Sequence, residues 1–109
     1  MTGTVQIGEK EVIFCGNAAT AIRYKQVFHR DLLMSIKGMS VEELDADIIK
    51  ELAFIMACQS EGSDFKQTTF DDFISWLEQF EENDILSKSV DIMSLWMQNV
   101  KPLVKAKKK

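Results

Sequence analysis

The sequence has few of the residues that interrupt helices or build metal sites. Its 109 residues include one Pro, five Gly, two Cys and one His. So few Pro and Gly residues favour a small number of long helices over many short strands. Cys15 and Cys58 each lie in an apolar run, VIFC and LAFIMAC, and form no CxxC pair. We therefore expect them to be small buried hydrophobic side chains rather than a disulfide.

Long apolar runs are also missing. No stretch approaches the roughly eighteen uncharged apolar residues that a membrane-spanning helix needs. The N-terminus lacks the charged and then apolar pattern of a signal peptide. We therefore expect a cytoplasmic protein with no membrane partner. With 46% apolar residues, a chain of this length can bury the core of one domain.

The acidic and basic residues are distributed unevenly. Residues 1–100 contain eight Lys or Arg and all seventeen Asp or Glu, which gives this part a net charge of −9. An acidic body argues against a nucleic-acid-binding face, because it repels phosphate groups. Residues 101–109, KPLVKAKKK, carry five Lys and no acid. We expect them to form a separate, flexible basic tail.

The succession of patterns predicts a mainly α (α+β) fold. Residues 1–100 are expected to form a single domain in which four helices follow a short N-terminal β-hairpin at about residues 4–15. In the hairpin, Val5 and Ile7 alternate with polar neighbours before the chain turns. Two strands alone are only marginally stable. The hairpin therefore either caps the helical core or offers its edge to a partner.

Residues 17–38, NAATAIRYKQVFHRDLLMSIKG, predict one long amphipathic helix. Asn17 is a favoured N-cap. Gly38 supplies a stop, because Gly adopts the left-handed backbone without a side-chain clash. The apolar stripe of this helix contains Ala21, Phe28, Leu32 and Ile36. The opposite face carries Arg23, Lys25, Gln26, Arg30 and Lys37.

Two further helices are predicted in the middle of the chain. Residues 40–43, SVEE, match a capping box that begins the second helix. Residues 52–58 are all apolar, which places this helix at the centre of the fold, and Gly62 is its expected end. Thr69 is expected to cap a third helix from Phe70 to about Glu81. The expected buried side of this helix contains Phe70, Phe73, Ile74 and Leu77.

The fourth helix is predicted from about residue 85 to residue 100, before Pro102. One apolar stripe repeats at steps of four and three, as in a helix laid along another helix. This stripe contains Leu86, Val90, Met93, Met97 and Val100. A second line, Ile85, Ile92 and Trp96, lies about 100° around the helix. Either the helix sits in a groove between two others, or the second line is an exposed strip for a partner.

The sequence contains no recognisable catalytic or metal-binding motif. The lone His29 has no partner at metal or catalytic-triad spacing. A calcium loop, a Walker glycine loop, a GxSxG elbow and an HExxH motif are all missing. The carboxylates cluster near predicted helix ends, where they cap the helices or keep the surface solvated. We therefore predict no catalytic, cofactor-binding or metal-binding residue, no cofactor and no enzymatic activity.

Residues 24–32, YKQVFHRDL, resemble a run in the tail assembly chaperones of long-tailed bacteriophages and related prophages of Gram-positive bacteria. The shared pattern is an aromatic residue, a basic residue, a two-residue gap, Phe, a spacer, a basic residue, Asp and an apolar residue. The hairpin before it and the acidic, Trp-containing helices after it also fit, so the likeness spans most of residues 4–100. Family members often have Gly after the Phe, where this chain has His29.

The resemblance implies a non-structural helper of virion morphogenesis. Such a protein binds the long, helix-rich tape measure protein before the tail tube polymerises around it. It acts in the host cell cytoplasm and is not part of the mature virion. A homo-oligomer is also compatible with this role. The alternative function is a small regulatory or nucleic-acid-associated helical protein that uses the Lys-rich tail, and this predicts salt-dependent DNA binding.

Candidate partner-binding residues lie on the first and fourth predicted helices. They are Arg23, Tyr24, Phe28, Arg30, Asp31, Ile85, Ile92 and Trp96. For those on the first helix, the alternative role is solvation and helix pairing. If recognition is their role, substituting Arg30 and Asp31 together should weaken partner binding and leave folding intact.

Overall fold

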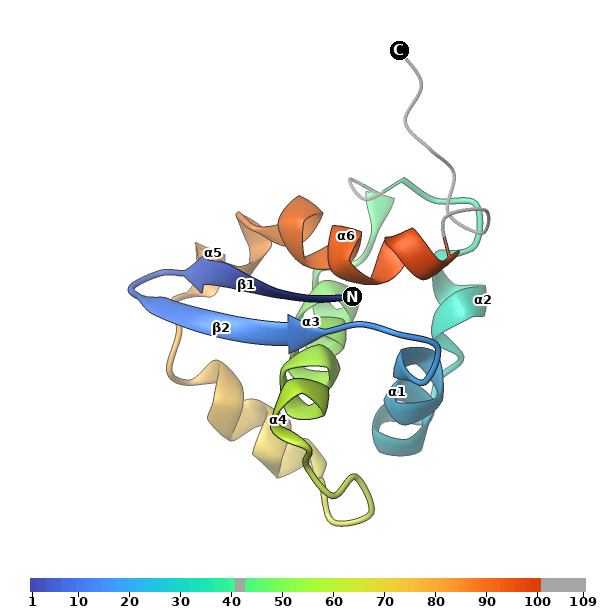
Figure 1. The fold of residues 1–109 in the computed structure, drawn as a ribbon, viewed down its shortest axis with the longest axis horizontal. Coiled ribbons are helices and arrows are strands. Elements are labelled where there is room, and N and C mark those ends of the chain that lie inside the picture. The colour runs from blue at the N-terminus through green and yellow to red at the C-terminus, as the bar shows by residue number, and fades with distance from the viewer. Residues whose placement is uncertain (41–42, 101–109) are drawn as a thin grey trace.

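The chain folds as an N-terminal hairpin followed by helices (Figure 1). The computed structural model describes residues 1–40 and 43–100, with side chains as far as Trp96. The elements are β1 (Thr2–Ile7), β2 (Lys10–Cys15), α1 (Thr20–Phe28), α2 (Leu32–Ile36), α3 (Ala46–Glu61), α4 (Phe70–Leu77), α5 (Glu82–Leu86) and α6 (Ser89–Val100). This mainly helical α+β architecture confirms the predicted fold class. Over the described ranges, no helix is long and apolar enough to cross a membrane. The predicted basic tail, residues 101–109, lies outside these ranges.

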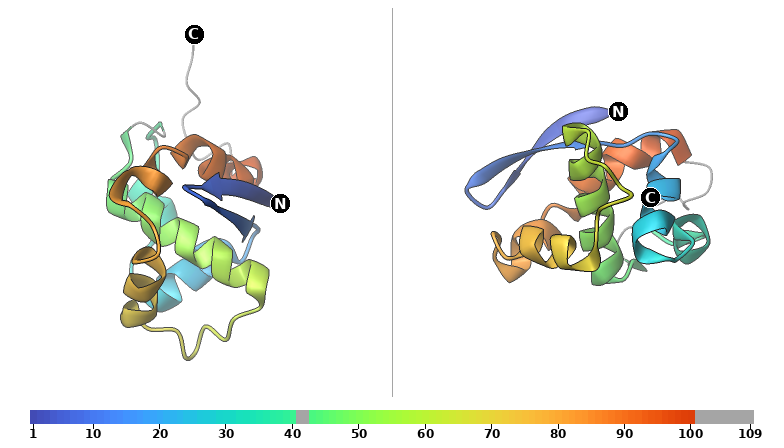
Figure 2. Two further views of the ribbon diagram at one scale, coloured as in Figure 1. Left: turned by 90° about the vertical axis from the view of Figure 1, so that its left-hand side faces the viewer. Right: turned by 90° about the horizontal axis from the view of Figure 1, so that it is seen from below.

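The helix α3 is the centre of the fold, as its apolar run predicts. Every residue from Glu51 to Cys58 is buried. Figure 2 shows α3 with α4 on one side, α1 on the other and the hairpin across a third side. Gly62, with a φ of 73°, ends the helix as predicted.

The hairpin closes one side of the core. β1 and β2 pair antiparallel with Ile7 opposite Lys10, and Gly8, with a φ of 61°, forms the tight turn. The inward side chains Val5, Ile7 and Phe14 are buried, and the strands contact α3 and α6. Of the two predicted roles, the structure therefore shows the first, in which the hairpin caps the helical core.

The predicted single helix over residues 17–38 is wrong, because the chain divides it into α1 and α2. His29 has φ 61° and ψ 32°, and its N–H donates to a carbonyl one turn earlier, which ends α1. The Asp31 side chain then accepts a backbone N–H of the first turn of α2 at 3.1 Å. The bend between the two helices lets Leu32 and Ile36 lie fully buried in the core.

The two predicted ends of that segment are partly right. The Asn17 side chain accepts the N–H of Ala19 at 2.8 Å, so it fixes the turn before α1 instead of capping the helix itself. The Thr20 hydroxyl at the start of α1 donates to Gln59 of α3 at 2.7 Å. Gly38 has the predicted left-handed backbone, with a φ of 80°, but α2 has already ended at Lys37, whose ψ is 125°.

The helix α3 begins later than its capping-box motif predicts. The Glu43 carboxylate accepts the Ser40 N–H at 3.0 Å, as in a capping box. However, α3 starts only at Ala46, where Asp45 is the N-cap and accepts the Asp47 N–H at 2.8 Å. The cap nearer to the buried run therefore starts the helix. Residues 41–42 lie outside the described residues.

The last two predicted helices are shorter than expected. Thr69 caps α4 as predicted, but α4 ends at Leu77 rather than at about Glu81. The predicted helix over residues 85–100 is two helices, α5 and α6. Acidic capping explains the earlier start of α5, because the Glu81 N–H donates to the Asp84 carboxylate at 2.9 Å.

Both cysteines are free thiols, as predicted. Cys58 is buried on α3, and Cys15 is half-buried at the end of β2. Burial raises the pKa of the Cys58 thiol to about 11. This thiol therefore stays protonated and unreactive at neutral pH.

Replacing Gly16 with Ala is expected to destabilise the protein by about 1–3 kcal/mol, because it overpacks the contact with α6. An added Cβ would lie 2.9 Å from the Leu95 carbonyl oxygen and 3.0 Å from the Trp96 Cα, which are backbone atoms that cannot rotate away. At Gly3 the nearest atom is the Leu95 Cδ2, at 2.8 Å, the end of a flexible side chain. Urea unfolding should therefore show a much smaller loss for Gly3→Ala. Equal losses would contradict this explanation.

Replacing His29 with Gly is expected to stabilise the protein by about 1 kcal/mol, because a side chain in the left-handed region is strained. His29→Ala is the matched control, since it removes the imidazole but keeps the Cβ that causes the strain. Thermal and urea unfolding should show a gain for Gly only. The same gain for Ala would assign the effect to loss of the imidazole.

Candidate functional site

A groove lies where α1 ends and α4 begins, and we call it the α1–α4 groove. It has a volume of about 460 Å³. Its walls come from the end of α1, the link to α2, α3 and the start of α4. The residues that line it are Gln26, Val27, Phe28, His29, Arg30, Glu51, Thr68, Thr69 and Phe70. The break between α1 and α2 therefore forms one wall of this groove.

Phe28 is the centre of a cluster of aromatic rings beneath the groove. Its ring centroid lies 5.2 Å from that of Tyr24, 6.4 Å from Phe54, 6.5 Å from Phe70 and 5.0 Å from Phe73. The last three pairs are edge-to-face, an arrangement that aromatic quadrupoles favour. These contacts hold the Phe70 ring at the rim of the groove.

Phe70 and Ile74 form an exposed apolar strip beside the groove. They are one turn apart on α4 and are 56% and 36% exposed. The prediction that both are buried is therefore wrong. Phe73 between them is buried, because it faces Phe54 of α3 with 5.4 Å between ring centroids. Exposed apolar surface beside a groove is typical of binding sites.

A buried carboxylate closes the inner end of the groove. Glu51 of α3 is 5% exposed, and its Oε1 accepts hydrogen bonds from the Tyr24 hydroxyl and the Arg30 guanidinium. Burial raises the pKa of Glu51, and the contacts with Tyr24 and Arg30 partly oppose that rise. Burial also raises the pKa of Tyr24. The network ties α1 and the link after it to the central helix.

The structure separates the site residues predicted on the first helix. Tyr24 is fully buried, and Phe28 is half-buried in the groove. Arg30 bonds Glu51 at the groove, whereas Asp31 caps α2 outside it. Arg23 lies away from the groove, with its guanidinium carbon 4.9 Å from the centroid of the Phe65 ring.

The contacts of Arg30 and Asp31 argue against the expectation that both can be replaced without affecting folding. Arg30 is the cationic partner of a buried acid, and removing one partner of such a pair leaves an uncompensated charge. Asp31 is the N-cap of α2, and losing a cap costs about 1 kcal/mol. A double substitution therefore does not separate recognition from stability.

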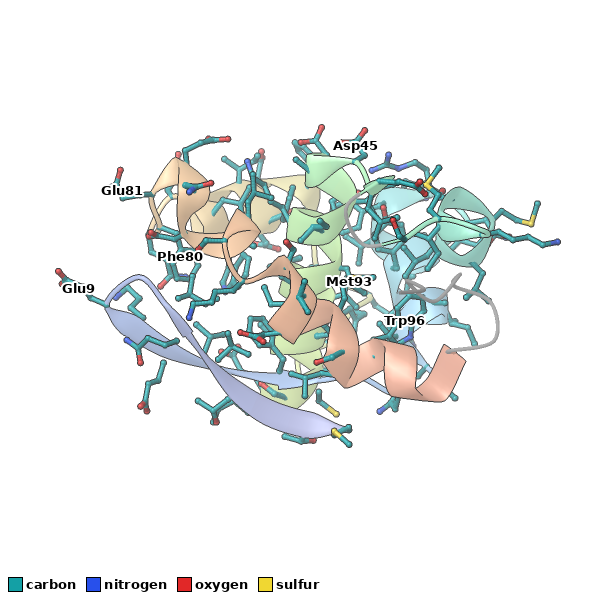
Figure 3. All side chains as sticks on the ribbon, turned by 90° about the horizontal axis from the view of Figure 1, so that it is seen from above. Glu9, Asp45, Phe80, Glu81, Met93 and Trp96 are labelled. Atoms are coloured by element: carbon teal, nitrogen blue, oxygen red, sulfur yellow. The ribbon has the colours of Figure 1, made fainter. Side chains whose placement is uncertain are left out.

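The second apolar line of the predicted fourth helix is core and not an exposed strip. Ile85 is 2% exposed, Ile92 is 0% and Trp96 is 1%. Figure 3 shows Met93 and Trp96 on α6, which lies across the hairpin and α3. The contacts of α6 bury Ile92 and Trp96, and Ile85 is buried on α5, which contacts α3. Of the two alternatives, the one in which this segment packs between its neighbours is therefore observed.

The first apolar stripe of that helix divides between core and surface. Met93 is fully buried and Leu86 is half-buried. Val90 is 61% exposed, because it lies on the side of α6 away from the hairpin and α3. The side chains of Met97 and Val100 lie outside the described part of the chain.

Glu51 is the residue that sequence reasoning missed. It follows Ile48 by three positions and precedes Ile55 by four, so it shares the buried face of α3. A single acid on an otherwise apolar helix face is a signal for a buried, partnered carboxylate. The exposure of Phe70 had no comparable signal, because its spacing fits the buried side of α4.

The groove offers ring faces and one cation. In the described ranges, no group of three or more His, Cys, Asp or Glu side chains could hold a metal ion. The Glu51 carboxylate is covered by its two donors, whereas Arg30 is 46% exposed. The arrangement suits apolar side chains, with Arg30 available to a carboxylate at the rim.

Replacing Glu51 with Gln is expected to change how stability depends on pH. The pKa of Glu51 is raised in the folded state, so its protonation stabilises the fold. This contribution is fully present below the unfolded pKa of about 4.3 and is lost as the pH rises through the folded value. Urea unfolding should show wild type gaining stability relative to Glu51→Gln as the pH falls from 7 towards the unfolded pKa. The control Glu9→Gln removes an exposed carboxylate of the hairpin turn. Parallel curves for wild type and Glu51→Gln would contradict the assignment.

The similarity of the chain to known proteins was tested in three ways. Comparison with protein-family models, with curated protein sequences and with solved structures finds no match.

Proposed function

We propose that this protein is a phage tail assembly chaperone, a non-enzymatic factor that binds the tape measure protein during tail morphogenesis. It acts in the host cell cytoplasm and is absent from the mature virion. The observation that carries the proposal is the exposed strip of Phe70 and Ile74 beside a groove built in part from residues 24–32. Those residues carry the resemblance to the chaperone family.

The roles of the resembling residues support the proposal. The aromatic, the Phe and the final apolar residue of the pattern are Tyr24, Phe28 and Leu32, and all three pack in the core or against it. His29, where family members often have Gly, has a φ of 61°. A left-handed residue at this point suits Gly better than any other residue, so the family pattern is compatible with this helix break.

The surface of the groove suits a helix of a partner rather than a small polar ligand. Phe70 and Ile74 present apolar area along one turn of α4, and an amphipathic helix places its own apolar residues at the same spacing. Burying a large apolar side chain contributes about 1.5–3 kcal/mol. The net charge of −9 over residues 1–100 keeps such a complex dispersed in water.

Phe70→Asp is expected to weaken binding of the tape measure protein at least tenfold, because it places a charge in the apolar strip. Phe70 is the first residue of α4, where Asp favours the helix dipole. Val90→Asp is the matched control, since Val90 is 61% exposed and also lies in the first turn of its helix. Co-expression with the tape measure protein of the same gene cluster, followed by co-purification, measures both effects.

Two results would overturn different parts of the proposal. Wild-type protein that forms no complex and does not keep the tape measure protein soluble would rule out the chaperone function. A complex that Phe70→Asp and Val90→Asp weaken equally would leave the function and remove the α1–α4 groove as its site. Circular dichroism of each variant checks that the fold is retained.

A further inference from the structure

A second groove lies between the hairpin and the C-terminal end of α4, and we call it the hairpin groove. It consists of two adjoining hollows of about 460 Å³ and 330 Å³, which share Lys10, Gln79 and Phe80. Figure 3 shows Glu9 on the hairpin turn, with Phe80 and Glu81 at the same end of the molecule. The hairpin groove and the α1–α4 groove have no lining residue in common.

The floor of the hairpin groove is apolar. Trp76 and Phe80 pack edge-to-face with 5.1 Å between ring centroids, and both rings are only partly buried. Ile13 of β2 lies beside them and is 53% exposed. The Ser60 hydroxyl shares its proton between the Ile13 carbonyl at 2.8 Å and the Ala57 carbonyl of α3 at 2.7 Å, which links this wall to α3. The groove therefore has a rigid floor that can bury aliphatic side chains.

The rim of the hairpin groove is acidic. Its lining includes five carboxylates and one lysine, which gives a net charge of −4. The carboxylates are those of Glu9, Glu11, Glu61, Glu81 and Asp84. Asp84 accepts the Glu81 N–H, and none of the five forms an ion pair within the described ranges. Carboxylates around an apolar floor favour a ligand with both cationic and aliphatic side chains.

We propose that the hairpin groove binds the basic segment 101–109 of a second copy of this chain. The segment, KPLVKAKKK, carries five Lys to meet the five carboxylates. Its adjacent Leu103 and Val104 supply the aliphatic side chains that Trp76 and Phe80 can bury. No other stretch of the sequence combines this density of Lys with the absence of acid. The proposal is independent of the chaperone function, because it uses a different surface.

The reach of the segment favours a second copy over the same chain. α6 ends at the opposite end of the long axis from the hairpin turn (Figure 1), and the molecule extends 38 Å along that axis. Nine residues span at most about 30 Å when fully extended. A segment that begins at the end of α6 therefore does not extend to the hairpin-turn end of the groove of its own molecule. Between two copies, each segment can enter the groove of the other in a symmetric exchange.

Charge reversal on each side of the proposed contact tests it in the full-length protein. Sedimentation of wild type should show a concentration-dependent dimer whose dissociation constant rises at least tenfold between low and high salt. A tail variant, Lys105→Glu with Lys107→Glu and Lys108→Glu, should weaken the dimer at least tenfold. A groove variant, Glu11→Lys with Glu61→Lys, should do the same. An equimolar mixture of the two variants should associate more tightly than either variant alone, because the reversed tail meets the introduced lysines while the unchanged tail meets the unchanged groove.

The control for the groove variant is Glu43→Lys with Asp91→Lys, which makes the same +4 change in net charge at exposed positions outside the groove. It should dimerise like wild type. A wild-type protein that stays monomeric at every concentration overturns the proposal, including the case in which a segment reaches its own groove. Association that survives both reversals, or that the mixture does not restore, also overturns it. Circular dichroism confirms that the variants remain folded.

Discussion

The burial of α3 on every side is the constraint on which the rest of the structure depends. This helix runs for sixteen residues and is apolar around most of its circumference. One neighbouring helix covers only one stripe, so such a helix needs neighbours all round. The hairpin, α1, α4, α5 and α6 each contact it. A chain of 109 residues therefore uses most of its other elements to enclose one helix.

The one acid on the buried face of α3 explains the break between α1 and α2. A buried carboxylate is costly unless it is hydrogen-bonded and paired. Tyr24 supplies a hydroxyl from within α1, and Arg30 supplies the cation from the link after the left-handed residue. The turn at His29 thus ends the helix and places Arg30 where it pairs with Glu51.

The sequence predicts the features that depend on local chemistry. The apolar run of α3, the stop at Gly62, the cap at Thr69 and the hairpin at the start of the chain are all present. Where helical periodicity and an N-cap residue predict different helix boundaries, the sequence does not predict which boundary forms. The helical spacing of the apolar residues is not interrupted between Phe28 and Leu32. The N-cap residue Asp31 therefore lies inside a pattern that predicts one continuous helix.

The candidate site was predictable only in part, because exposure depends on distant elements. Phe28 and Arg30 were predicted together and both line one groove, whereas Tyr24 is buried beneath it. Ile85, Ile92 and Trp96 have the spacing of a free strip, but the hairpin and α3 cover them. Phe70 and Ile74 have the spacing of a core stripe, yet within the described part of the chain they are 56% and 36% exposed. Helical periodicity predicts which residues share a face and not whether a neighbour covers it.

The hydrogen bond from Ser60 to the Ile13 carbonyl has a consequence for aggregation. A two-stranded hairpin has outer edges at which unpaired backbone groups can recruit another strand. In the pairing register of this hairpin, the backbone groups of Glu11 and Ile13 face outward from β2. Ser60 occupies one of these carbonyls, and the charged Glu11 side chain lies on the same stretch. This contact and the nearby charge make the edge of β2 beside the exposed aromatic floor a poorer template for cross-β stacking.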